Sequence, residues 1–294
     1  MARTEKKSFI IKGRIPSLGI TYYERGGKVY ARSSTRKSPS KQTFGQFAAR
    51  CKMRHSIALW RCFDPDHKPL MQVQEGLIPY NVFLRANASL PTVFLTKPIT
   101  NLGGALLMPQ MVVSTGHLPQ VEYRFETLED GSRVVLTNLA TRIPAEETRE
   151  LTPATNEDWF NLLCLGSVNP NLMSGYTIRF YRFEQLMDDS CPRMRVNCLE
   201  LQLNHNITPL RGLLGWRFLS VGGHVAIADA NDENMGWAVV LYDENSHSAS
   251  PQQVLTTCRF YEQYTTDEAS AAAADSFGNV ALPPFLTPNT KSRG

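Results

Sequence analysis

Strand-like segments follow one another through most of this 294-residue chain without regular helices between them. They include residues 121–139, 175–186 and 193–204, and the first of these alternates apolar and polar residues around Asp130-Gly131. Successive parallel strands need a long crossover, usually a helix, whereas antiparallel strands need a short turn. The sequence therefore predicts a mainly β fold with a β-sandwich-like body of antiparallel sheets. One face of such a sheet is expected to be exposed to solvent.

The N-terminal part has a different pattern, in which two strand-like runs flank Gly26-Gly27. A two-residue glycine loop favours a type I′ hairpin, because both central positions need positive φ. The loop predicts a register with these residues opposite each other: Arg25 and Lys28, Tyr23 and Tyr30, Thr21 and Arg32. One face of the hairpin is then basic and aromatic. The other is the packing face, made of Ile20, Tyr22, Val29 and Ala31.

A helix is predicted from Pro39 to about Cys62, with Ser38 as its N-cap. Apolar residues recur along it at helical spacing, beside a stripe of three arginines: Arg50, Arg54 and Arg61. The hairpin and this helix form a predicted small α+β module, residues 1–69. A mostly antiparallel β body, residues 70–265, and a flexible C-terminal tail, residues 266–294, are expected to follow.

Several finer expectations concern the body. A second short helix is predicted near residues 81–88 and another near 157–166, and residues 92–96 and 105–113 look like buried strands. The apolar positions of 193–204 change phase at Cys198-Leu199, which predicts a β-bulge. Residues 222–230 and 236–244 are predicted to pair as a hairpin across the acidic loop between them.

Charge divides the chain unevenly although its net charge is +4. Residues 1–61 hold fifteen Lys and Arg and two acids, a net +13, and the rest holds sixteen against twenty-five, a net −9. Cations neutralise phosphates and tyrosines stack on bases, so nucleic acid is one partner that the basic end predicts. An acidic neighbouring subunit, or simple solvation, fits the same residues. The predicted surface for an anionic partner comprises Tyr23, Arg25, Lys28, Tyr30, Arg32, Arg36, Lys37, Arg50, Arg54 and Arg61.

Two cysteines and two histidines lie within residues 51–67, which raises the question of a metal site. On one helix His55 and Cys62 are about 10 Å apart along the axis, whereas zinc holds its ligand atoms at about 2.0–2.3 Å. Cys51 and His55 alone could share an ion only with ligands from elsewhere. We therefore interpret Cys51, His55 and Cys62 as a core-facing stripe and predict no metal.

Catalytic motifs give weak signals. The chain has no phosphate-binding glycine loop, and residues 220–226, "SVGGHVA", lack the nucleophile elbow of acyl-transfer enzymes. We interpret Gly222-Gly223 as a turn and His224 as an ordinary strand residue. Residues 229–234, "DANDEN", begin a segment with Asn234 at the sixth position, where a calcium loop requires glycine, and Val240 at the twelfth, where it requires glutamate, so a solvated acidic turn is expected. The sequence predicts no catalytic residue and no cofactor.

The six cysteines show no regular spacing, which favours free thiols. No apolar run approaches the roughly 20 residues that cross a bilayer. The basic start carries an apolar segment of three residues, shorter than the 7–15 or so of a signal peptide. A cytoplasmic protein with no membrane partner is expected.

Four stretches, residues 28–34, 41–60, 105–119 and 222–244, together resemble an uncharacterised family of Bacteroidales proteins, a domain of unknown function. The likeness covers about residues 10 to 265. It implies the layout of hairpin, helix and β body, and a bacterial or phage-derived origin in the cytoplasm or a virion. It implies no activity and no site residues.

The sequence as a whole favours a non-enzymatic structural or interaction protein, such as a component of a phage-like or mobile-element assembly. Its basic end and acidic body favour head-to-tail contact with a second copy or a neighbouring subunit, and hence an oligomer. A nucleic-acid-binding protein that uses the basic module is the alternative, and an enzyme of unknown type comes third.

Overall fold

The computed structural model divides the chain into two compact units, residues 1–42 and residues 43–294. It describes residues 13–15, 20–25, 28–33, 41–73, 76–164, 168–170, 172–186, 191–207, 210, 213 and 215–281. Each unit is described below by itself.

The first unit contains an antiparallel sheet of β1 (Gly13–Ile15), β2 (Ile20–Arg25) and β3 (Lys28–Ser33), with β2 in the middle. The β2–β3 register confirms the predicted hairpin: Arg25 lies opposite Lys28, Tyr23 opposite Tyr30, and Thr21 opposite Arg32. β1 was not predicted as a strand. It pairs with β2 and sets Arg14 opposite Thr21.

The centre of the second unit is a sheet of long strands in the order β11-β10-β14-β15, with β17 also paired to β14. Its members are β10 (Tyr176–Leu186), β11 (Arg193–Gln202), β14 (Met235–Asp243), β15 (Ser248–Ala249) and β17 (Leu255–Thr256). All of these neighbours are antiparallel. The predicted hairpin between residues 222–230 and 236–244 is wrong, because β14 pairs with β10 and lies in a different sheet from residue 224.

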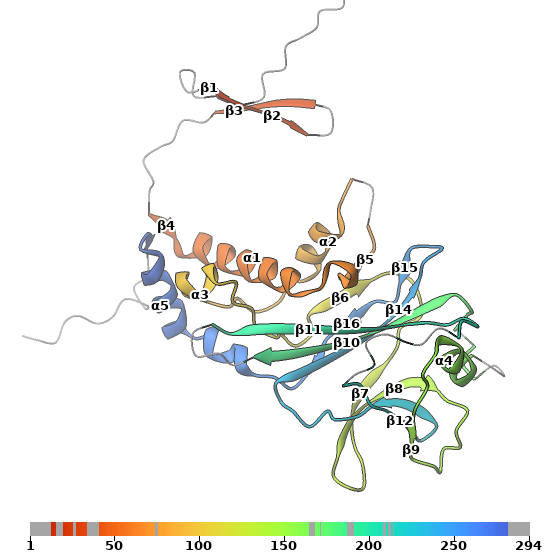
Figure 1. Cartoon of the computed structure of the whole chain (residues 1–294). Helices are drawn as coiled ribbons and strands as arrows, with labels where there is room; N and C mark the ends of the chain where they lie inside the picture. Colours follow the sequence, from red (N-terminus) through yellow and green to blue (C-terminus); the bar gives the residue numbers. More distant parts are fainter. Residues whose placement is uncertain are drawn as a thin grey trace, which may run out of the picture. The chain divides into compact units, whose positions relative to one another are not determined.

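A second antiparallel sheet, in the order β7-β8-β13-β12-β9, covers one face of the central sheet (Figure 1). It consists of β7 (Tyr123–Thr127), β8 (Arg133–Ala140), β9 (Arg149–Leu151), β12 (Phe218–Val221) and β13 (His224–Ile227). Val135 and Phe218 from this sheet share one core cluster with Phe180, Leu201 and Trp237 from the central sheet. The fold is thus mainly β with antiparallel, sandwich-like packing, which confirms the predicted class.

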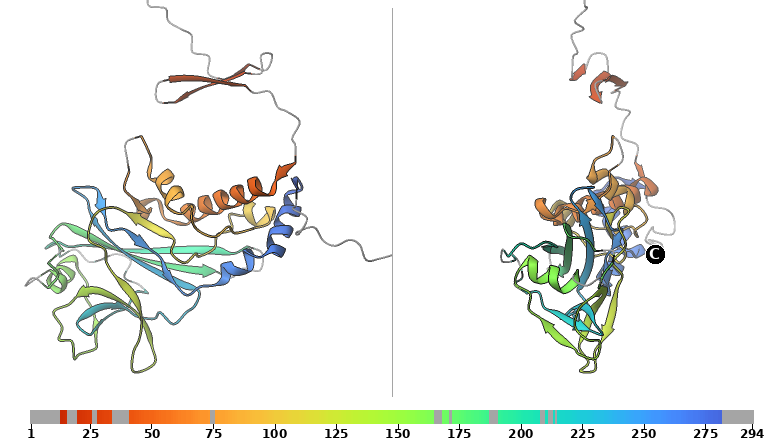
Figure 2. Two further views of the ribbon diagram at one scale, coloured as in Figure 1. Left: turned by 180° about the vertical axis from the view of Figure 1, so that it is seen from behind. Right: turned by 90° about the vertical axis from the view of Figure 1, so that its right-hand side faces the viewer.

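Helices and an extended segment cover the opposite face of the central sheet (Figure 2). This layer contains α1 (Phe44–Cys62), a 3-10 helix (Pro65–His67), β5 (Leu70–Met71), α2 (Pro79–Ala86), α3 (Lys97–Asn101), β6 (Val112–Thr115) and β16 (Gln252–Gln253). Most of segment 104–113 is buried, but only its last two residues belong to a strand, and residues 92–96 form none. The strands predicted there are therefore mostly extended chain without ladder pairing.

Burial on both faces explains the phase change in β11. Met194, Val196 and Cys198 contact the cluster beneath the helices, whereas Leu199, Leu201 and Leu203 lie in the cluster between the sheets. The β10–β11 register runs from Leu186↔Arg193 to Thr177↔Gln202 without a shift. The predicted bulge near Cys198-Leu199 is wrong, because the two halves of one regular strand bury opposite faces.

The helix predicted from Pro39 begins at Phe44. Thr43 is its N-cap: Thr43 Oγ1 accepts from the Gln46 N–H, and Gln46 Oε1 accepts from the Thr43 N–H, at 3.3 Å each. Such a capping box satisfies two of the free donors at a helix start. Ser38 and Pro39 lie outside the described residues. Because Phe47, Cys51 and Leu59 are buried in core clusters of the second unit, α1 belongs to the body rather than to a 1–69 module.

The C-terminal part also differs from the expected flexible tail at residues 266–294. A 3-10 helix (Phe260–Tyr264) leads to α5 (Asp267–Phe277), capped by the Thr266 hydroxyl, and the short strand β18 (Val280–Ala281) follows. Ala273 and Ala274 of α5 pack against Phe47 and Cys51 of α1. Small side chains permit this close packing, so a segment with little apolar bulk is nevertheless docked. Residues 282–294 lie outside the described part.

The remaining elements include two short helices that lie close to their predicted positions. β4 (Gln42–Thr43) precedes α1, and α4 (Asn156–Leu163) matches the predicted short helix, buried through Trp159, Phe160 and Leu163. α2 lies within two residues of the helix predicted at 81–88.

Candidate anionic-partner surface

Five of the ten predicted surface residues lie on the described strands of the first unit: Tyr23, Arg25, Lys28, Tyr30 and Arg32. The antiparallel register puts them on one face of the β2–β3 pair, because residues directly opposite share a face and alternate positions repeat it. The Tyr23–Tyr30 pair lies between Arg25–Lys28 on one side and Thr21–Arg32 on the other. Tyr30 is 42% exposed.

Strand β1 adds a cation that the sequence prediction did not include in this surface. Arg14, Thr21 and Arg32 form one cross-strand row, so Arg14 falls on the same face as the basic and aromatic positions. The signal for this strand was weak. "GRI" is three residues long, and Pro16 and Gly19 bound the four residues that separate it from β2. Arg36 and Lys37 lie outside the described residues.

The three arginines of α1 belong to the second unit, whereas the hairpin positions belong to the first. Arg50 and Arg61 are exposed. The Arg54 guanidinium lies 4.4 Å from the centre of the Phe277 ring, a cation–π contact that ties α1 to α5. Arg54 therefore has a packing role within the second unit.

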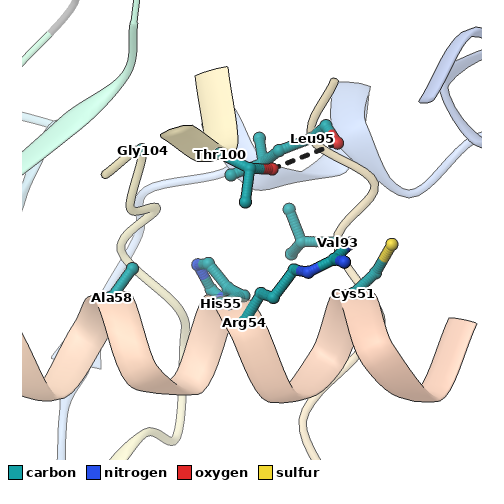
Figure 3. Close-up of a pocket in the computed structure, with 8 residues that line it drawn as sticks. All are labelled: Cys51, Arg54, His55, Ala58, Val93, Leu95, Thr100 and Gly104. Carbon is teal, nitrogen blue, oxygen red and sulfur yellow. Dashed lines mark hydrogen bonds between the residues drawn. The ribbon is translucent and has the colours of Figure 1, made fainter. Parts of the chain in front are cut away.

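Cys51 and His55 lie on the buried face of α1, as predicted (Figure 3). Cys62 is partly buried. His55 is 5% exposed, and its Nε2 accepts the Leu106 N–H at 3.1 Å. Burial lowers the pKa of His55 to about 4, so the ring is neutral at pH 7. Its hydrogen bond fixes the extended segment 104–113 against α1.

The pKa values of Cys51 and Cys62, on the same helix, shift in the opposite direction to that of His55. Burial raises the pKa of Cys51 and of Cys62 to about 11, so both thiols stay protonated at neutral pH. The cavity lined by Cys51, His55 and Thr100 measures about 20 Å³, room for one water molecule. A neutral imidazole and one protonated thiol, that of Cys51, in so small a cavity are typical of packing residues rather than of a nucleophile and its base.

Two other motifs have structural roles. Gly222 and Gly223 have φ of +56° and +75° and form the turn between β12 and β13, which confirms the predicted turn and leaves His224 as a strand residue. In the acidic loop 229–234, Asp229 pairs with Arg217 at 3.2 Å, and Asn231 Oδ1 accepts the Arg133 N–H at 2.8 Å. These contacts link the loop to neighbouring strands.

Within the part of the chain that the structure describes, no helix is long and apolar enough to cross a membrane. No family model, no curated protein and no solved structure matches this chain. The fold and the basic strand pair define a mainly β protein with an N-terminal basic sheet.

Proposed function

We propose that this chain is a non-enzymatic binding protein whose β1–β3 sheet contacts single-stranded nucleic acid. The observation that carries the proposal is the register of that sheet, which gathers Arg14, Arg25, Lys28, Arg32 and two tyrosines on one face. No acidic residue falls among the described positions of this face, because Glu24 alternates to the other one.

The order of residue types on the face supports a nucleic acid partner. Proteins that bind single strands combine cations, which follow the backbone, with aromatic rings, on which bases stack. Here a cross-strand tyrosine pair is flanked on one side by a pair of cations and on the other by a row with two arginines. Neighbouring rows along a strand that share a face are about 6.8 Å apart. An acidic protein surface would need the cations but not the tyrosines between them.

The charge of the rest of the chain limits where a polyanion can bind. Residues 1–42 hold eleven Lys and Arg against two acids, a net +9, whereas residues 43–294 hold twenty against twenty-five, a net −5. Long-range electrostatics therefore steer a polyanion to the first unit. The same asymmetry is what favours the second candidate, head-to-tail association of copies within an assembly in the cytoplasm or a virion.

Charge reversal separates the two candidates. In the full chain, Arg25→Glu with Arg32→Glu is expected to weaken binding of a labelled 15-nucleotide oligothymidine by more than about tenfold at 50 mM salt, measured by fluorescence anisotropy. The matched control reverses two exposed arginines of the second unit, Arg142→Glu with Arg193→Glu, which changes the net charge equally. This control is expected to bind within about twofold of the wild type.

Two further measurements complete the test. Tyr23→Ala with Tyr30→Ala is expected to weaken oligothymidine binding more than binding of duplex DNA, since paired bases are not available to stack. Equal losses for both hairpin and control reversals would overturn the proposed site. Absence of binding, together with an oligomer in sedimentation velocity that Arg25→Glu with Arg32→Glu dissociates, would replace nucleic acid with self-association.

A further inference from the structure

A groove in the second unit lies between α2 and the adjoining ends of β5 and β6. Its volume is about 570 Å³, within the range of small-molecule sites, and its lining comprises Gln72, Val73, Leu77, Val82, Arg85, Ala86, Thr115, Gly116 and His117. A second hollow of about 390 Å³ shares Gln72, Val73 and Thr115 with it and extends toward Leu70 and Tyr242. The two hollows are therefore neighbours that share part of one wall.

The α2 wall of the groove is held in place by a buried amide. Val82, Arg85 and Ala86 are three and four residues apart, so they lie on one side of α2, while Phe83 is fully buried. Asn87, also fully buried, accepts the Val112 N–H at 2.8 Å and donates to the Val112 carbonyl at 3.0 Å. Both bonds fix the end of α2 to β6.

The floor is fixed by backbone contacts. Thr115 Oγ1 accepts the Gln72 N–H at 2.9 Å, and the His117 N–H donates to Ser248 Oγ at 3.4 Å. At Gly116 a Cβ would meet the Ala249 carbonyl oxygen at 2.0 Å, so only glycine lets β6 leave the sheet so close to β15. The groove is therefore preformed, so the protein loses little conformational entropy when a ligand binds.

The lining combines apolar side chains with one arginine, Arg85, and one histidine, His117. Val73 is 43% exposed in the groove although it is apolar, beside Leu77 and Val82. Among the residues that the structure describes, the side chains of Arg85 and His117 make no hydrogen bond or ion pair. The described lining of both hollows contains no carboxylate, and residues 74 and 75 are outside the described part.

We infer that this groove binds a small apolar carboxylic acid, with its carboxylate at Arg85 and its chain along Val73, Leu77 and Val82. A carboxylate accepts charge-assisted hydrogen bonds from a guanidinium, whereas an ammonium group would be repelled and an alcohol would gain less. Burial of the chain removes apolar surface of both ligand and groove from water. The site is independent of the proposed nucleic acid contact.

The test is calorimetric titration of the full chain with octanoate, octanol and octylamine at equal chain length. Octanoate is expected to bind most tightly and octylamine least, and decanoate more tightly than octanoate by about fourfold per added methylene. Arg85→Gln is expected to weaken the binding of octanoate by about three- to fivefold and to leave the affinity for octanol unchanged. Arg193→Gln, at an exposed arginine outside the groove, is the matched control and should change neither.

A second variant fills the groove instead of changing its charge. Ala86→Phe is expected to abolish binding of octanoate and octanol alike, with a thermal unfolding midpoint close to that of the wild type. The inference is overturned if octanoate produces no binding at millimolar concentration, if octanol binds as well as octanoate, or if Ala86→Phe binds normally. Oligothymidine binding by Arg85→Gln should equal that of the wild type, so failure here leaves the proposed function unaffected.

Discussion

Phe180→Ala and Phe183→Ala are each expected to lower the free energy of unfolding by about 3–5 kcal/mol. The two side chains are fully buried and lie in different core clusters on opposite faces of β10. Phe180 lies 5.1 Å from Phe218 of the second sheet, between ring centres, and Phe183 lies 5.8 Å from Phe63, just after α1. Truncating either one leaves a cavity in a packed layer.

The measurement is urea denaturation of both variants, with Ile207→Ala as the control. Ile207 is 72% exposed, so its truncation is expected to cost less than about 0.5 kcal/mol. Similar large losses for both phenylalanines indicate a central sheet buried on both faces. A loss below about 1 kcal/mol for either one would mean that its face is open to water, contrary to the three-layer arrangement.

The stability of the protein is expected to fall as the pH decreases from about 6.5 to 4, in part because of His55. Burial holds the pKa of His55 at about 4 in the folded chain, against about 6.5 when unfolded. Between pH 6.5 and 4 the unfolded state thus binds a proton at His55 that the folded state does not bind. The stability that neutral His55 contributes is therefore complete above pH 6.5 and is lost as the pH falls toward 4. Its size is about 3 kcal/mol at 1.36 kcal/mol per pKa unit.

Comparison with His55→Gln isolates this residue from the other titrating groups. The Gln side chain still offers an oxygen to the Leu106 N–H but has no proton to gain. At pH 7 the variant is expected to be the less stable protein. Urea denaturation gives the free energy of unfolding of both proteins at pH 7 and at pH 4. Between these two pH values the wild type is expected to lose about 3 kcal/mol more stability than the variant. Parallel pH profiles would show that His55 titrates normally.

The sequence predicted local features whose causes are local. The β2–β3 register could be predicted because only two residues, both glycine, separate the strands in the sequence, which leaves little choice of partners. The Gly222-Gly223 turn and the buried stripe with Cys51 and His55 follow from positive φ and from helical spacing in the same way. The mainly β class followed from strands without intervening helices.

Features that depend on distant partners were not predictable from the same patterns. The alternation of β11 gives no sign of which face meets which layer, so its phase change resembled a bulge. β14 pairs with β10, about 50 residues earlier, because central strands of a sheet need two partners. The α1 arginines were assigned to a basic surface by charge alone, whereas Arg54 contacts Phe277, more than 200 residues away. Arg14 was missed because β1 is only three residues long.

The salt dependence of oligothymidine binding by the full chain tests the central claim most directly. If Arg14, Arg25, Lys28 and Arg32 each neutralise one phosphate, the logarithm of the binding constant should fall with the logarithm of salt at a slope of about −3. Between 50 and 200 mM salt this corresponds to about a fiftyfold loss of affinity, and Arg25→Glu with Arg32→Glu should make the slope shallower. A slope near zero, or no binding at 50 mM salt, would contradict a nucleic acid contact on the β1–β3 sheet.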